Sequence, residues 1–266
     1  MTSELIQMLR LEPVEADRYV GQNLADSQGV VFGGQLLAQS VAAAASSVPD
    51  MHLKSMHTIF TRAASSTQPV ELDVERLHQG RSFASVEVSI RQGARLCTRS
   101  LVLFDKPDAD LITFCADPPV VAPPDDLVPS AVTRRGWDVQ IVGDVDISDP
   151  DAVGPPELLV WSRFADVPDA EWMSQALLAY ASDGFLIGTA MRPHPGVGQA
   201  LAHVSIATTV ITQTLTFHEH VDAGDWLLLA HASPHAGRGR SFGRADVYGA
   251  DRRLVASYAQ ENMIRA

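Results

Sequence analysis

GRSFASVEVSI, at residues 80–90, and GRSFGRADVY, at residues 239–248, begin with the same four residues. In both stretches apolar and polar residues then alternate, which is the pattern of a β-strand with one buried face. Each stretch ends in a turn, at residues 92–93 or 249–251, and a second strand-like run follows. Two strands joined by a short turn make a β-hairpin, so the sequence predicts two related hairpins.

The same order of elements lies upstream of each hairpin. Residues 56–61 and 204–218 are rich in β-branched and aromatic side chains, which favours strands. Residues 34–48 and 171–190 carry apolar side chains at helical spacing over a wide face. Each half therefore runs from a helix into several antiparallel strands, and we expect two copies of one α+β unit.

The segment between the two halves has a different composition. Residues 105–157 hold nine of the sixteen prolines and eleven aspartates. Paired prolines do not fit inside regular elements, so this segment is predicted to be a long connector with little regular structure. Trp137 and Ile141 are the connector residues expected to pack on a surface. The chain thus divides into an N-terminal unit (residues 1–104), the connector and a C-terminal unit (residues 158–266).

The overall composition limits the class of protein. The 266 residues are 46% hydrophobic and 20% charged, as in ordinary globular proteins. The net charge of −12 is a poor match for binding nucleic acid or an anionic membrane. Two cysteines, Cys97 and Cys115, cannot form a disulfide framework or a four-cysteine zinc site. No apolar run is long enough for a membrane span, and no signal peptide is recognised, so a cytoplasmic protein is expected.

Short motifs in both halves resemble those of one known family. They are, in order, VFGGQ (31–35), HTIFTR (57–62), GRSF (80–83), YASD (180–183), TFH (216–218), DWLLL (225–229) and LVAS (254–257) followed by Gln260 and Glu261. Together they resemble the type II acyl-CoA thioesterases, from about Leu11 to the C-terminus. The resemblance implies a double hotdog, an α+β fold in which two helices are each wrapped by an antiparallel sheet and the halves form one continuous sheet.

The resemblance also implies an activity. Members of that family hydrolyse fatty acyl-CoA to free fatty acid and coenzyme A. No cofactor is implied, because coenzyme A is part of the substrate. The resemblance further implies a homodimer or homotetramer. Two alternatives remain open at this point. The chain could bind acyl-CoA with little turnover, or it could be a hotdog enoyl-CoA hydratase or dehydratase.

The family's reaction needs no covalent enzyme intermediate. An Asp, a Ser or Thr, and a Gln activate a water, and backbone N–H groups at a helix start polarise the thioester carbonyl. By resemblance, Asp183 matches the acid and Gln260 the glutamine. When the family's motif is aligned without gaps at residues 217–218, the position of its Ser or Thr falls on Val210, which has no hydroxyl.

Threonines flank the position of Val210. Thr208 and Thr212 lie two residues to either side and are expected to share its strand face. Thr209 would need a bulge or a register shift to reach the same face. Because Val210 lacks the hydroxyl of the family's Ser or Thr, a protein that binds acyl-CoA with little turnover is an alternative.

The residues themselves suit this chemistry. Asp183 follows the apolar run 177–181, and a carboxylate on an apolar helix face is a good proton acceptor. A glutamine such as Gln260 can donate and accept hydrogen bonds at once. Gly34 lies at a helix start, where a ligand can approach closely and N–H groups stabilise negative charge. Each residue also has a purely structural alternative. Asp183 could be a helix cap, Gln260 could point outward from its strand, and Gly34 could belong to an ordinary turn.

The two predicted helices can be compared by aligning their Gln-x-Leu steps. Gln35 then matches Gln175, and Ala43 matches Asp183. The first helix lacks an acid at that place, so we expect one composite site, with the acid from the second half and the oxyanion donor from the first.

Coenzyme A is strongly anionic, so it needs local positive charge. The candidate partners are Arg81 beside the Gly turn at residue 80, and Arg238, Arg240 and Arg244 beside the Gly turn at residue 239. The guanidinium group suits phosphate because it can donate two parallel hydrogen bonds. Surface arginines are common, so each of these positions has an ordinary alternative.

Histidines suggest two other chemistries. His218 and His220 share a strand face, with Asp222 and Asp225 nearby, and such residues can bind zinc or iron. The resemblance implies no metal at this place. His57 is the residue that a hydratase would need beside the thioester. No phosphate-binding loop is present in the sequence. Residues 239–243 match Gly-x-Ser-x-Gly, but they lie in a predicted hairpin and not at a strand-to-helix turn, so a nucleophilic serine is not expected.

Overall fold

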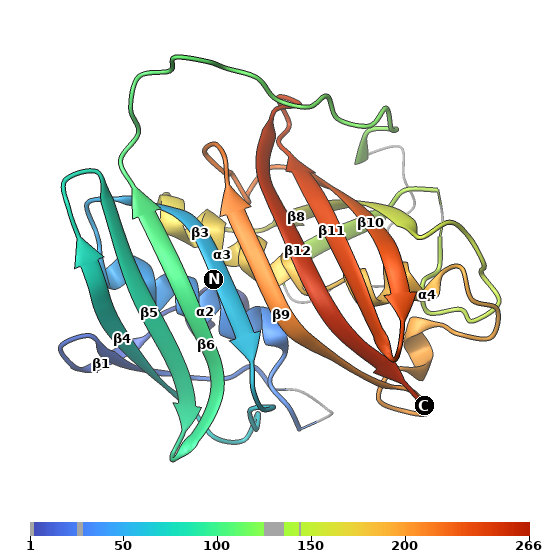
Figure 1. The fold of residues 1–266 in the computed structure, drawn as a ribbon, viewed down its shortest axis with the longest axis horizontal. Helices are drawn as coiled ribbons and strands as arrows, with labels where there is room; N and C mark the ends of the chain where they lie inside the picture. Colours follow the sequence, from blue (N-terminus) through green and yellow to red (C-terminus); the bar gives the residue numbers. More distant parts are fainter. Residues whose placement is uncertain (1–2, 26–28, 125–135, 144) are drawn as a thin grey trace.

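The computed structural model describes residues 3–25, 29–124, 136–143 and 145–266. One antiparallel sheet of twelve strands, in the order β1-β2-β4-β5-β6-β3-β9-β12-β11-β10-β8-β7, crosses the whole molecule, and the main helices lie on one side of it (Figure 1). The strands are β1 (Glu12–Glu15), β2 (Arg18–Gly21), β3 (His52–Phe60), β4 (Val70–Gln79), β5 (Phe83–Gln92), β6 (Arg95–Asp105), β7 (Trp137–Ile141), β8 (Glu157–Phe164), β9 (Ala207–Phe217), β10 (Leu227–Gly237), β11 (Arg240–Tyr248) and β12 (Leu254–Arg265).

The two halves meet at the centre of the sheet. β3 and β9 pair antiparallel, with His57 opposite Thr214 and Ser55 opposite Thr216. Hydrogen bonds therefore continue from one half into the other. The expected double hotdog with one continuous sheet is confirmed.

The connector contributes a strand to this sheet. β7 pairs with β8, and the two lie at the sheet edge of the second half as β1 and β2 do at that of the first. The side chains of Trp137 and Ile141 are buried. The segment 105–157, predicted to have little regular structure, thus contains a strand that belongs to the sheet of the second half.

The helices are α1 (Glu4–Met8), α2 (Gly33–Ser47), α3 (Glu171–Ser182) and α4 (Leu186–Met191), and a short 3₁₀ helix, η2, spans Gln199–Leu201. α2 and α3 pack against each other, and twelve residues of α2 are buried. Small buried side chains of α2, among them Ala42, Ala43 and Ala44, let neighbouring elements pack close to this helix.

One helix predicted over residues 171–190 is two helices in the structure. α3 ends at Ser182 and Asp183 takes the C-cap position, where its backbone keeps helical angles. The N–H of Gly184 donates to the carbonyl of Ala181, which tightens the last turn, and α4 begins only at Leu186. The continuous apolar pattern hid this break, and the break places Asp183 at the end of a helix.

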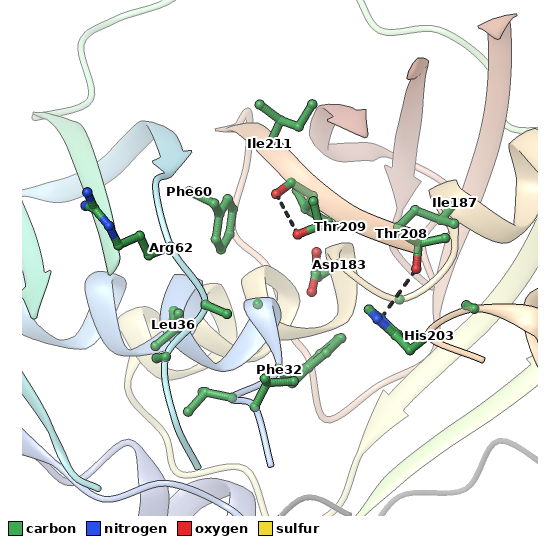
Figure 2. Close-up of a pocket in the computed structure, with 18 of the residues that line it drawn as sticks. Phe32, Leu36, Phe60, Arg62, Asp183, Ile187, His203, Thr208, Thr209 and Ile211 are labelled. Atoms are coloured by element: carbon green, nitrogen blue, oxygen red, sulfur yellow. Dashed lines mark hydrogen bonds between the residues drawn. The ribbon is translucent and has the colours of Figure 1, made fainter. Parts of the chain in front are cut away.

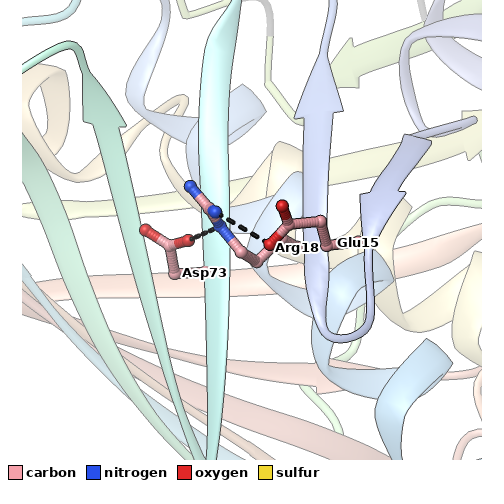
Figure 3. A network of polar contacts seen from close by, with 3 residues as sticks. All are labelled: Glu15, Arg18 and Asp73. Carbon is pink, nitrogen blue, oxygen red and sulfur yellow. Dashed lines mark hydrogen bonds and ion pairs between the residues drawn. The ribbon is translucent and has the colours of Figure 1, made fainter.

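A surface ion-pair network links β1, β2 and β4 at one edge of the sheet. The guanidinium of Arg18 on β2 donates to Asp73 at 2.8 Å and to Glu15 at 3.0 Å (Figure 3). The hydrogen bond to Asp73, and then that to Glu15, raise the pKa of Arg18. The Arg18 side chain is 52% exposed, so solvent screens these pairs and they add little stability. Among the described residues, no helix is both long and apolar enough to cross a bilayer.

Candidate active site

A cavity of about 670 Å³ lies where the two halves meet. The first half lines it with the start of α2 and the end of β3, and the second half with the break after α3 and the start of β9 (Figure 2). Asp183 faces this cavity from the second half, and Gly33 faces it from the first. The cavity is therefore composite, as the comparison of the two helices led us to expect.

The carboxylate of Asp183 is held by donors from two different elements. The backbone N–H of Gly34 donates to Oδ2 at 2.8 Å, and the side-chain amide of Gln260 donates to Oδ1 at 3.0 Å. The structure thus brings three of the predicted site residues together, although Asp183 is 149 residues from Gly34 and 77 from Gln260. Asp183 thereby satisfies one of the free N–H groups at the start of α2, where the helix dipole favours negative charge.

Close backbone approach explains the two glycines at the start of α2. A β-carbon at Gly34 would lie 2.3 Å from the carbonyl oxygen of Tyr180 and 2.5 Å from a ring carbon of Phe32. A β-carbon at Gly33 would lie 2.7 Å from Oδ2 of Asp183. Only residues without a side chain let the helix start come this near to the carboxylate.

A pair of buried glutamines lies behind the carboxylate. Gln260 on β12 pairs in register with Gln213 on β9, and both side chains are almost fully buried. The amide of Gln213 donates to the hydroxyl of Ser182 at 3.0 Å. The two amides therefore support neighbouring residues at the end of α3, but only Gln260 contacts the carboxylate.

A bulge in β9 decides which threonine lines the cavity. Glu261 pairs with Thr212 and Asn262 pairs with Val210, so Ile211 is an extra residue in β9. An extra residue reverses which face later side chains take. The expectation that Thr208 and Thr212 share a face is therefore wrong.

The threonines separate accordingly. Thr208 lines the cavity and lies 3.4 Å from His203, and Thr209 lines it as well (Figure 2). Thr212 is absent from the lining and its hydroxyl donates to Glu261 at 3.3 Å. Two threonines thus line the cavity, and both directly precede the predicted gap at Val210.

The turns that carry the predicted arginines lie at opposite ends of the strands. The turn that carries Arg81 joins β4 and β5 beside the beginning of β3, whereas the cavity lies at the other end of β3. Arg81 therefore does not line this cavity, and its contact with coenzyme A stays a prediction. Arg238 and Arg240 lie at the turn of β10 and β11, on the end of the sheet where β12 meets the start of β9.

Sequence reasoning missed several lining residues. Arg62 and His203 line the exposed part of the cavity, and Trp137 and Phe185 line a buried part. Arg62 ends the motif at residues 57–62, which was the available signal for it. His203 and Trp137 come from irregular or connector segments, and no local pattern marks them.

The histidines considered for other chemistries lie elsewhere. His57 is exposed, its Nδ1 lies 2.8 Å from the hydroxyl of Thr214, and it does not line the cavity. The Nε2 of His218 lies 3.0 Å from the hydroxyl of Ser257. Across the part of the chain that the structure describes, no group of three or more His, Cys, Asp or Glu is gathered around a possible metal site.

A buried tyrosine–histidine pair lies deeper in the second half. The hydroxyl of Tyr258, two residues before Gln260, donates to Nε2 of His231 at 2.6 Å, and Nδ1 of His231 donates to the carbonyl of Leu158 at 3.1 Å. Burial, and then the negative charge of Asp183, raise the pKa of Tyr258 well above its usual value. Burial lowers the pKa of His231 from 6.5 to about 4. The pair is therefore neutral at physiological pH.

We expect this pair to make stability depend on pH. Because the folded-state pKa of His231 lies below its unfolded value, the stability it supports is complete above pH 6.5 and is lost as the pH falls toward 4. The loss is about 3 kcal/mol in the free energy of unfolding. Denaturant unfolding of the wild type and of His231→Gln, from neutral pH to pH 4, measures it. The glutamine keeps both hydrogen bonds without titrating, so equal pH slopes in the two proteins would contradict the prediction.

Family models match nearly the whole chain. The model described as the acyl-CoA thioesterase N-terminal domain matches residues 24–105, and that described as the C-terminal domain matches residues 115–264. Acyl-CoA thioesterase 2 of Haemophilus influenzae is 27% identical over 99% of this chain and 97% of its own length. Acyl-coenzyme A thioesterase 8 of the mouse is 27% identical over 97% of this chain and 88% of its own.

Solved structures show the same architecture. An acyl-CoA thioesterase II from Mycobacterium marinum, TesB2, has a TM-score of 0.84 at 28% identity and covers 98% of each chain. A tesB protein from Mycobacterium avium subspecies paratuberculosis has a TM-score of 0.85 at 25% identity and covers 99% of each chain. The similarity therefore includes both halves and the connector between them.

Proposed function

Because the chain belongs to the acyl-CoA thioesterase family, and is an acyl-CoA thioesterase, we propose that it hydrolyses the thioester with a water activated by Asp183 and Gln260. One observation carries this mechanism. The Asp183 carboxylate lines the cavity between the halves while two donors from other elements fix its orientation. A positioned carboxylate can take a proton from water, and a thioester is reactive enough for such a water to attack.

The reaction balances without a covalent intermediate. The water oxygen bonds to the thioester carbon while Asp183 takes the proton, and the carbonyl oxygen becomes an oxyanion. Collapse of the tetrahedral intermediate breaks the carbon–sulfur bond. The proton on Asp183 then passes to the leaving sulfur, which releases coenzyme A and a fatty acid. The carboxylate returns to its starting state, ready for the next turnover.

The start of α2 has two functions in this proposal. Its Gly34 N–H orients the carboxylate, which differs from the oxyanion role suggested by the sequence. Its positive end also lies along the cavity wall at Gly33, where it favours negative charge on the thioester oxygen. The hydroxyls of Thr208 and Thr209 are the candidates for holding the water from the opposite side.

Coenzyme A would approach from the exposed part of the cavity. Arg62 lines that part and can pair with a phosphate, and Arg238 and Arg240 add positive charge at the neighbouring end of the sheet. The position of His57 on the outer face of the sheet speaks against the hydratase alternative, which needs this residue beside the thioester. The cytoplasmic location and the dimer or tetramer stay predictions.

Replacing Gln260 tests the proposed support of the carboxylate. In Gln260→Ala the Oδ1 of Asp183 loses the donor at 3.0 Å, so the carboxylate can rotate away from the water. We expect kcat to fall by about tenfold to a hundredfold with a smaller change in KM. The measurement is thiol release from acyl-CoAs with a thiol-reactive dye.

Gln213→Ala is the matched control. It removes the same side chain from the adjacent strand, but the amide of Gln213 donates to the hydroxyl of Ser182, whereas that of Gln260 donates to the carboxylate. We expect a much smaller loss of kcat in this variant. Equal losses in the two variants would mean that Gln260 acts only through packing, and would contradict its proposed function.

A further inference from the structure

One buried residue that lines the cavity comes from the connector. Trp137 begins β7, the strand at the sheet edge, and its side chain is 2% exposed. Trp137 lines the same cavity as Asp183. Its ring atom Cη2 lies 3.3 Å from the place that a β-carbon would take at Gly184. Gly184 follows Asp183 in the chain, so the indole ring lies beside the catalytic end of α3.

The indole ring is fixed by its surroundings. Its N–H donates to the hydroxyl of Ser162 at 2.8 Å. Its ring stacks on Phe164 with centroids 5.7 Å apart, and the edges of Tyr180 and Phe185 approach at 5.6 and 5.9 Å. A ring with a satisfied donor and three aromatic neighbours has little room to move. It can therefore act as a rigid wall.

The cavity lining contains both exposed polar residues and buried apolar residues. Polar and exposed residues, among them Arg62, His203 and Thr209, line one part of the cavity. Buried apolar residues, among them Leu36, Trp137 and Phe185, line another. An acyl-CoA has a charged head and an apolar tail, so the tail would enter the buried part while the thioester stays beside Asp183.

We propose that Trp137 forms the end wall of the acyl-binding part of the cavity and so limits the length of acyl chain that the enzyme accepts. The inference rests on the proposed function, because it takes the substrate to lie with its thioester at Asp183. It assigns the connector between the two hotdog units a direct role in substrate selection. A chain too long for the cavity meets the fixed indole and cannot bring its thioester to the carboxylate.

Chain-length profiles test the proposal. We would measure kcat/KM for saturated acyl-CoAs from butyryl to palmitoyl in the wild type, in Trp137→Leu and in Trp161→Leu. One methylene in an apolar pocket changes kcat/KM by roughly tenfold or more, so Trp137→Leu should raise the ratio of long-chain to short-chain kcat/KM by at least about tenfold. Trp161 is the control, because its ring lies outside the cavity lining and its N–H donates to the carbonyl of Ala122.

A second measurement leaves Trp137 in place, since removing a buried indole can unfold the protein. Replacing Trp161, Trp172 and Trp226 with phenylalanine leaves Trp137 as the only one of the four tryptophans. Non-hydrolysable acyl-CoA thioethers with a terminal bromine would then be bound at increasing chain length. We expect quenching of the indole fluorescence to rise sharply at the length whose bromine reaches Trp137.

The outcomes separate this inference from the proposed mechanism. If Asp183 and Gln260 variants lose thiol release but a folded Trp137→Leu keeps the wild-type profile, the inference about Trp137 is overturned alone. Quenching that does not depend on chain length overturns it as well. If those site variants retain full thiol release, the proposed mechanism fails, whatever the chain-length profile shows.

Discussion

Asp183→Asn should lower kcat by about a hundredfold to ten-thousandfold while the protein stays folded, because the amide cannot take a proton from water. The fold should survive since asparagine caps a helix about as well as aspartate does. Its carbonyl oxygen can still accept from the N–H of Gly34, and Gln260 can turn its own carbonyl toward the new amide. The measurement is thiol release from acyl-CoA, together with thermal unfolding of both proteins.

Binding separates a chemical defect from a structural one in this variant. The Asn side chain has the same shape, so acyl-CoA should bind to Asp183→Asn with a dissociation constant close to the wild-type KM. A variant that binds acyl-CoA but releases no thiol indicates loss of the proton acceptor. A kcat within about tenfold of the wild type would show that another group activates the water, and the proposed mechanism would be wrong.

Gly34→Ala should be the most destabilising change at the site. The added β-carbon would lie 2.3 Å from the carbonyl oxygen of Tyr180, and a backbone atom cannot move aside as the end of a side chain can. Separating α2 from α3 would disturb the packing of both halves. We expect the free energy of unfolding to fall by about 3 kcal/mol or more, measured by denaturant unfolding.

Gly33→Ala is the matched comparison for this prediction. There the nearest atom, 2.7 Å away, is Oδ2 of Asp183, which can rotate. We expect a small loss of stability and a large loss of kcat, because the carboxylate leaves its position. In Gly34→Ala we expect the loss of stability to be the larger of the two effects. If both variants are equally stable, the close contact between α2 and the backbone of Tyr180 does not limit folding.

Local patterns in the sequence predicted the regular elements well where apolar residues recur with a clear period. The helix expected over residues 34–48 is α2, and the strands expected over 56–61 and 204–218 are β3 and β9. The repeated GRSF marks equivalent hairpins, so the two-unit organisation could be read directly from the sequence. These features depend on residues near one another in the chain, which is why one sequence was enough.

The same patterns failed where a single residue interrupts an element. The apolar run over 171–190 continues through Asp183, although the helix ends there. Alternation in β9 suggested that Thr208 and Thr212 share a face, although the extra residue Ile211 reverses it. Bulges and helix breaks are set by pairing with distant strands and helices, and periodicity does not report them.

By itself the sequence determined the two α+β units, their helices and central strands, and, through its motifs, the family; it also proposed Asp183 and Gln260 as site residues. Only the tertiary structure decided how these residues are used. It brought Gly34 to the carboxylate, placed Arg81 at the far end of the sheet and drew Trp137 from the connector into the cavity. The physical reason is that short-range periodicity sets which face of an element is buried, whereas packing between the halves sets which buried faces meet.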